Sequence, residues 1–263
     1  MNNKERNKAV WRLIRQIIHT EKVLLCILTS SVIYAFVSNY FTHCSPMCLS
    51  PNVLDVMASI DETLRNCCYG VIAGIAFYLV NDLYKNAYKK VDLYNAMYPN
   101  LYNLWLKTYQ LILTVNNCEL DKTHSNDELL LSIMSNLCKL SEEGTFHRLN
   151  LDIPADKFHV LYILWSDALK DKDKFLEVYG HTIEREEYSK LNDKELDNSI
   201  ERLKENVPND EQIAKAKMIK ISNYDIKRAI YLMLDYKSDL ASMVNKYSIY
   251  YYGNQRGVRK DAF

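Results

Sequence analysis

Few side chains in this sequence have the types and spacing that chemistry requires. His181 and Glu184 form an HxxE pair, and on a helix two residues three apart share one face, as metal ligands do. The stretch around them is highly charged, so we expect a solvent-facing pair rather than a metal site. Four further candidates have nothing that holds them together in space, and we expect core or surface roles for them: His147, His159, Asp152 and Asp156.

The cysteines are scattered and include no spaced CxxC pair of the zinc type. Cys118 and Cys138 lack a basic neighbour that would activate the thiol. Cys44 and Cys48 flank the tripeptide SPM and either form a disulfide or remain free thiols. No phosphate-binding glycine loop, nucleophile elbow or HExxH motif occurs. The sequence therefore predicts a protein that is not an enzyme and that holds no metal or cofactor.

Two apolar segments determine how the rest of the chain is placed. Residues 23–41 carry no charge over 19 positions, about 28 Å of helix, which is close to the thickness of a bilayer core. A cleavable signal peptide is the competing interpretation, but the following SNYFTHCSPMC lacks a clean small-x-small cleavage site. Residues 66–81 are also uncharged and span about 24 Å, which Leu83 and Tyr84 can extend. We therefore predict two membrane-spanning helices.

The distribution of basic residues predicts the orientation of these spans. Six of residues 1–22 are Lys or Arg, whereas the loop at 42–65 contains only Arg65 as a basic residue. Lys85, Lys89 and Lys90 follow the second apolar segment. By the positive-inside rule both termini lie in the cytoplasm and the loop lies outside, as in a multi-pass protein of the inner (plasma) membrane. The basic residues 1–22 form either an amphipathic helix on an anionic leaflet or a plain continuation of the first span.

One face of the second span predicts helix packing. Gly70 and Gly74 form a GxxxG, whose small residues let another helix backbone approach closely, either the first span or a second copy. The same face continues in steps of three and four, and its first six positions are the predicted helix-packing residues: Gly70, Gly74, Phe77, Asn81, Tyr84 and Tyr88. Further positions on this heptad stripe are Val91, Asn95, Tyr98, Tyr102, Trp105, Tyr109 and Ile112. The stripe indicates either a self-associating stalk or a helix that packs on its own domain, and Pro99 should kink or break it.

The remainder of the chain predicts a helical domain. Glycine and proline are scarce, with 6 and 5 copies, and apolar residues recur at helical spacing. Pro154 is expected to open a helix after an irregular or extended stretch at 146–153, and a long last helix is expected over 211–247. The tail places Tyr250, Tyr251 and Tyr252 next to basic residues, which suits single-stranded nucleic acid or an anionic leaflet, although we expect a frayed terminus.

The predicted fold class is an all-α membrane protein with two transmembrane helices followed by a helical cytoplasmic domain. Its parts are a basic amphipathic segment at 1–22, a transmembrane hairpin at 23–84 with an external loop at 42–65, and the domain at 85–263. The 33 basic and 33 acidic residues balance, which makes nucleic acid an unexpected partner. The expected partners are the lipid bilayer, further copies of the chain and a cytoplasmic protein.

This layout resembles a known class of proteins. The second segment YGVIAGIAFYLV, its basic exit at Lys85, Lys89 and Lys90, and the short outward loop resemble small two-span membrane effectors of bacterial anti-phage defence, the abortive-infection class. The resemblance is one of architecture, so no catalytic residue is carried over. It implies an oligomeric effector whose cytoplasmic domain senses or is held by a partner and whose spans permeabilise the inner membrane on release. The alternative is a membrane-anchored scaffold or receptor that recruits a cytoplasmic protein or nucleic acid.

Overall fold

The computed structural model describes residues 3–20, 22–41, 51–116, 125–138, 148–215 and 217–252. Helices make up most of this part of the chain, so the predicted all-α class is confirmed. The chain divides into two compact units, Met1–Leu93 and Tyr94–Phe263. The division lies within a helix, a few residues after the boundary at 84 and 85 that the sequence predicted.

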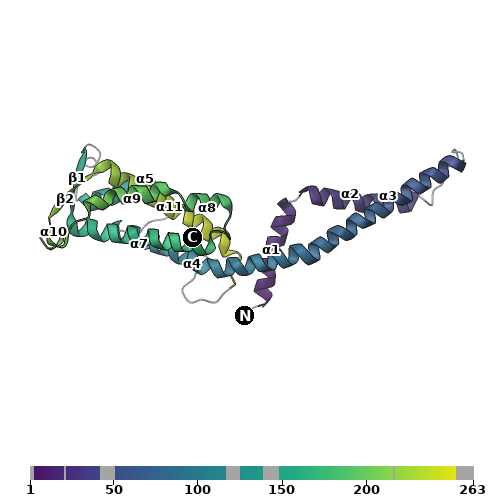
Figure 1. Ribbon diagram of the computed structural model, residues 1–263, viewed down its shortest axis with the longest axis horizontal. Coiled ribbons are helices and arrows are strands. Elements are labelled where there is room, and N and C mark those ends of the chain that lie inside the picture. Colours follow the sequence, from purple (N-terminus) through teal and green to yellow (C-terminus); the bar gives the residue numbers. More distant parts are fainter. Residues whose placement is uncertain are drawn as a thin grey trace. The chain divides into compact units, whose positions relative to one another are not determined.

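The first unit is a helical hairpin preceded by a short helix (Figure 1). Helix α1 (Asn3–Thr20) meets α2 (Lys22–Phe41) at a bend of 82°. Helix α2 then packs along α3 (Pro51–Phe77). Residues 51–64, which fall in the loop predicted at 42–65, are instead the first part of α3, which continues into the second apolar segment.

The second apolar segment belongs to one unusually long helical run. Helix α3 passes through a π-helical turn, η1 (Tyr78–Leu83), into α4 (Tyr84–Asn116). Pro99 lies inside α4, and the helix continues past it. Of the kink and the break that we expected at Pro99, the break is therefore wrong. The run Asp55–Thr114 is long and apolar enough to cross a membrane. The bent pair Asn3–Thr20 and Lys22–Ser38 is a second candidate if it counts as one broken span.

The second unit packs the end of α4 with a bundle of further helices. In Figure 1 α5, α7, α9 and α11 lie lengthwise beside one another. The largest fully buried side chains include Trp165, Tyr98, Tyr247 and Phe158. The elements after α4 are α5 (Asn126–Cys138), β1 (Asn150–Pro154), α7 (Ala155–Tyr179), α8 (Arg185–Leu191), α9 (Lys194–Leu203), η2 (Lys204–Asn206), α10 (Asp210–Ala214), β2 (Met218–Ser222) and α11 (Asn223–Ser248).

A two-stranded antiparallel ribbon closes one end of this bundle (Figure 1). Asn150 pairs with Ser222 and Pro154 with Met218, and the apolar residues of each strand are buried in alternation. The extended backbone expected before Pro154 is thus confirmed for residues 150–153. The single helix predicted over 211–247 is wrong, because β2 separates α10 from α11. The Ser222 hydroxyl ends the strand by accepting a hydrogen bond from the Asp225 N–H at the start of α11.

Candidate functional site

The glycine pair of α3 faces away from the hairpin. Gly70 and Gly74 are both exposed, and a Cβ added at either would meet no atom within 4 Å. Phe77, one turn further along, is 66% exposed. Among the described residues α2 is therefore not the partner of the GxxxG, and of the two partners that the sequence suggested a second copy is left. We call this surface, formed by Gly70, Gly74 and Phe77, the outward glycine face.

The close approach of α2 to α3 depends on small residues of α2 instead. Ser31, Ala35 and Ser38 are buried and follow one another at intervals of four and three. Small side chains at this spacing let two helix backbones come close together, as a GxxxG does. The letters SVIYAFVS carry this signal in the sequence, although serine and alanine at this spacing are a less obvious packing motif than the glycines of the second apolar segment. The hairpin contact and the outward glycine face are therefore separate surfaces.

A carboxylate of α3 anchors the far end of α2. The Tyr34 hydroxyl donates a hydrogen bond of 3.0 Å to one oxygen of Asp61, and the Ser38 hydroxyl donates one of 2.6 Å to the other. Asp61 falls within the loop predicted at 42–65, and nothing in the sequence indicates these two partners. These two bonds fix the register of α2 against α3, because a shift of either helix by one residue would break both.

Two other residues of the predicted packing face, Tyr84 and Tyr88, contact helix α1. The Arg6 guanidinium lies 3.8 Å from the centre of the Tyr88 ring and donates through Nε to Asp92 over 2.8 Å. The Trp11 and Tyr84 ring centres are 6.5 Å apart. Apolar residues on both helices are buried here, including Val10 and Leu13 of α1 and Ala87 of α4. Asn81, the remaining predicted position, is half-buried.

The later part of the predicted stripe packs inside its own unit. Tyr98, Tyr102, Trp105 and Ile112 are all buried, which favours the second of our two interpretations for this half of α4. The aromatic side chains form a continuous series, in which Tyr102 to Trp105 measures 5.7 Å between ring centres and Trp105 stacks on Tyr109 at 5.3 Å. A self-associating stalk over this part of the helix would have to expose these rings, so any contact between copies must lie elsewhere.

The C-terminal tyrosines complete this aromatic core. Tyr251 lies 4.8 Å from Tyr98 between ring centres, and the Tyr252 N–H donates to the Asn95 side-chain oxygen over 3.0 Å. Tyr250 and Tyr251 are 3% and 4% exposed. The frayed terminus that we expected is therefore wrong as far as Tyr252. The basic residues that would join a nucleic-acid surface, at 256, 259 and 260, lie outside the described residues.

Two carboxylates of α8 hold the last turns of α11. Glu187 accepts a hydrogen bond of 2.6 Å from the Tyr247 hydroxyl, and the Lys246 ammonium lies 2.7 Å from Glu187 and 2.8 Å from Glu184. Burial acts to lower the pKa of Lys246, but the two carboxylates outweigh it and raise that pKa. Burial, followed by the bond to Glu187, raises the pKa of Tyr247. Every charge here is paired, so the cluster stabilises the bundle and does not indicate a reactive site.

The buried tyrosines predict that the second unit loses stability in alkali. Burial raises the pKa of Tyr94 to about 12, from 10.0 for an exposed tyrosine. Between these values the unfolded chain releases a proton that the folded chain keeps, so stability falls as the pH rises above 10. Thermal unfolding at a series of pH values should show this fall, and Tyr94→Phe should make it shallower. Tyr224→Phe removes the hydroxyl of a tyrosine that is 63% exposed and should leave the slope unchanged; equal slopes for both variants would contradict the assignment.

The histidines and cysteines considered for chemistry are not brought together. His181 is exposed in the turn between α7 and α8 rather than on a helix, and Glu184 pairs with Lys246. His159 is half-buried in α7, and burial raises the pKa of the Cys138 thiol. No group of three His, Cys, Asp or Glu among the described residues could hold a metal ion. The other candidates lie outside those residues: Cys44, Cys48, Cys118 and His147.

Asp152 and Asp156 are on different elements, since Asp152 belongs to β1 and Asp156 to the first turn of α7.

The chain matches no protein-family model, no curated protein and no solved structure. Its function must therefore be inferred from its own surfaces. The most distinctive of these is the outward glycine face, which no part of the described hairpin covers.

Proposed function

We propose that this protein is a non-enzymatic integral membrane protein that assembles through its outward glycine face and disrupts the membrane. In this proposal α2 and α3 cross the inner membrane, both termini are cytoplasmic, and the helical second unit controls assembly by responding to a cytoplasmic protein. The setting that fits such an effector is bacterial anti-phage defence. The observation that carries the proposal is that Gly70 and Gly74 are exposed on an apolar helix, where an added Cβ would meet no atom within 4 Å.

The apolar exterior of the hairpin supports its placement in lipid. Phe36 of α2 is 76% exposed and Ile33 is 62% exposed, and Val71 and Phe77 of α3 are also exposed. In water each such side chain leaves about 1.5–3 kcal/mol of hydrophobic stabilisation unused. In a bilayer the same surface contacts acyl chains, and the backbone of both helices is internally hydrogen-bonded as lipid requires.

The glycines themselves favour assembly over simple anchoring. A glycine within a helix costs about 1 kcal/mol relative to alanine, because it loses more backbone freedom on folding. An anchor that only faced lipid would gain nothing in return. A second helix laid against this face could bring its backbone into van der Waals contact, which is the main attraction between helices in lipid.

Inducible expression in bacteria with a potential-sensitive dye tests the proposal. We expect the membrane potential to fall after induction, and the purified protein to migrate as an oligomer in mild detergent. Unchanged potential together with monomeric behaviour in detergent would contradict it. Growth arrest without depolarisation would also count against membrane disruption.

One feature favours the alternative of a membrane-anchored scaffold or receptor. A hollow of about 570 Å³ lies between α4 and α7 in the second unit. It is lined by polar groups such as Asn100 and Lys107 beside the exposed apolar side chain of Val178. If a cytoplasmic protein binds here, the full chain in detergent should recover it from cell extract and Val178→Asp should not. An intact membrane potential with such a partner would select this alternative.

A further inference from the structure

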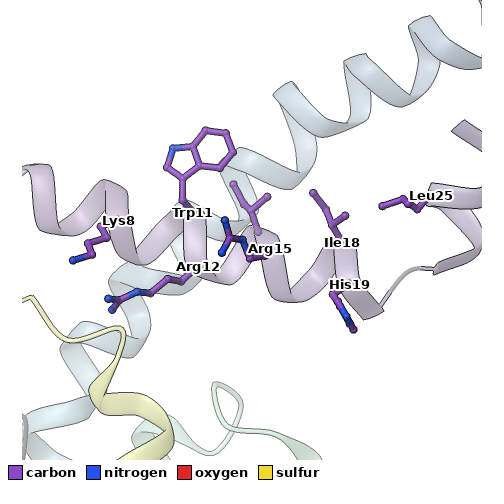
Figure 2. Close-up of a pocket in the computed structure, with 8 residues that line it drawn as sticks. Lys8, Trp11, Arg12, Arg15, Ile18, His19 and Leu25 are labelled. Carbon is purple, nitrogen blue, oxygen red and sulfur yellow. The ribbon is translucent and has the colours of Figure 1, made fainter. Parts of the chain in front are cut away.

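The bend between α1 and α2 encloses a hollow of about 690 Å³ within the first unit. Four basic side chains of α1 line it: Lys8, Arg12, Arg15 and His19 (Figure 2). They recur every three or four residues, so they follow one stripe of the helix. No carboxylate lines the hollow among the described residues, and its charge is therefore of one sign.

The remaining lining of this hollow is apolar. Trp11 and Ile18 come from α1, and Leu25 lies across the bend on α2 (Figure 2). Trp11 is 64% exposed and Leu25 is 44% exposed. The hollow therefore combines a cationic stripe with exposed apolar side chains.

We propose that this elbow binds the headgroup and upper acyl chains of an anionic phospholipid. The inference rests on the membrane placement proposed above. If α2 runs into the bilayer, the bend of 82° lays α1 along the headgroup layer, and the inside of the bend becomes a corner that lipid must fill. The arginine guanidinium binds phosphate oxygens with two parallel N–H donors, so Arg12 and Arg15 contact the phosphate while Leu25 and Trp11 contact the chains.

The assignment favours lipid over free phosphate because half of the lining would gain nothing from a small anion. A phosphate ion could use only the cations, whereas a phospholipid also covers the indole ring and the leucine. Indole rings prefer this interfacial depth, where their apolar body and polar N–H are both accommodated. The proposal also explains why α1 is basic on the stripe that does not pack against α4.

Tryptophan fluorescence of the full chain in vesicles tests the proposal directly. Trp105 and Trp165 are 8% and 1% exposed in the second unit, so quenching by brominated lipid reports on Trp11. Vesicles of phosphatidylcholine should contain a fixed minor fraction of either brominated phosphatidylglycerol or brominated phosphatidylcholine. We expect stronger quenching by the anionic lipid. In the double variant Arg12→Gln with Arg15→Gln the apparent affinity for it should fall about fivefold per arginine removed.

A matched variant separates this site from general surface charge. Lys89→Gln with Lys90→Gln removes two exposed cations of α4 that do not line the hollow, and it should keep the preference for anionic lipid. An equal loss in both double variants would overturn the site. Equal quenching by the two lipids would do the same while leaving the proposed function intact. Absence of quenching by either would contradict membrane placement itself, and loss of the preference on adding inorganic phosphate would reassign the hollow to a free anion.

Discussion

Replacing Gly70 and Gly74 together by leucine is expected to dissociate the oligomer and abolish membrane depolarisation. Both positions are open, because a Cβ added at either would meet no atom within 4 Å. The hairpin should therefore fold normally, since α2 contacts α3 through Ser31, Ala35 and Ser38 on a different surface. Two leucines would hold a second helix away from the α3 backbone. A loss of about 1.4 kcal/mol in that contact already weakens association tenfold.

The control for this prediction lies on α2. Ile33→Leu with Phe36→Leu changes two exposed apolar residues without touching the outward glycine face, and it should leave oligomer size and depolarisation unchanged. Ser31→Leu should act differently again, by separating α2 from α3 within one chain. Oligomers and depolarisation that survive the double glycine variant would place the contact between copies on another surface. Monomeric wild-type protein would remove the basis for assembly altogether.

The helical content and the apolar hairpin could be predicted because both depend on local sequence patterns. The partner of each face could not. A mostly apolar stripe at heptad spacing runs from Gly70 to Ile112, yet its beginning is exposed and its end is buried. The spacing of residues along one helix indicates that a face is apolar, but it does not indicate which surface covers that face. Tyrosine makes the difficulty worse, because its ring suits lipid interfaces and protein cores equally.

Features that join distant parts of the chain were missed for the same reason. The strand at Met218–Ser222 is short and lies within a helical pattern, and its ladder partner, Asn150–Pro154, is far away in sequence. Asp61 is one of several carboxylates in a polar stretch, and only the folded hairpin shows that Tyr34 and Ser38 donate to it. Contacts over such separations leave no periodic trace that a single sequence could reveal.

Lys172 is the clearest example in the second unit. It belongs to the run LKDKDKF, which has the composition of a solvated helix face, yet it is only 1% exposed in α7. Its ammonium group is paired with the carboxylate of Asp197 on α9. Tyr236 of α11 is also buried. Burial raises its pKa, and the negative charge of Asp197 raises it further. An ion pair therefore lies where three helices of the bundle meet.

Asp197→Ala is expected to destabilise the second unit by about 2–3 kcal/mol. The substitution leaves the buried Lys172 ammonium without a counter-charge, and an unpaired buried charge is strongly destabilising. The effect should fall below the upper end known for fully buried pairs, because the Asp197 side chain is 39% exposed and water reaches it. Denaturant unfolding of the full chain in detergent, followed by the fluorescence of Trp105 and Trp165, measures the change.

The complementary substitution identifies the desolvated lysine as the cause. Lys172→Met keeps the buried alkyl chain but removes the charge, so it should leave stability within about 1 kcal/mol of the wild type. Combined with Asp197→Ala it should restore most of the stability that the single aspartate variant loses, because no unpaired ammonium remains. Glu186→Ala breaks the exposed pair with Lys190 and should have no resolvable effect. If the double variant is as unstable as Asp197→Ala alone, the carboxylate stabilises the bundle through contacts other than this ion pair.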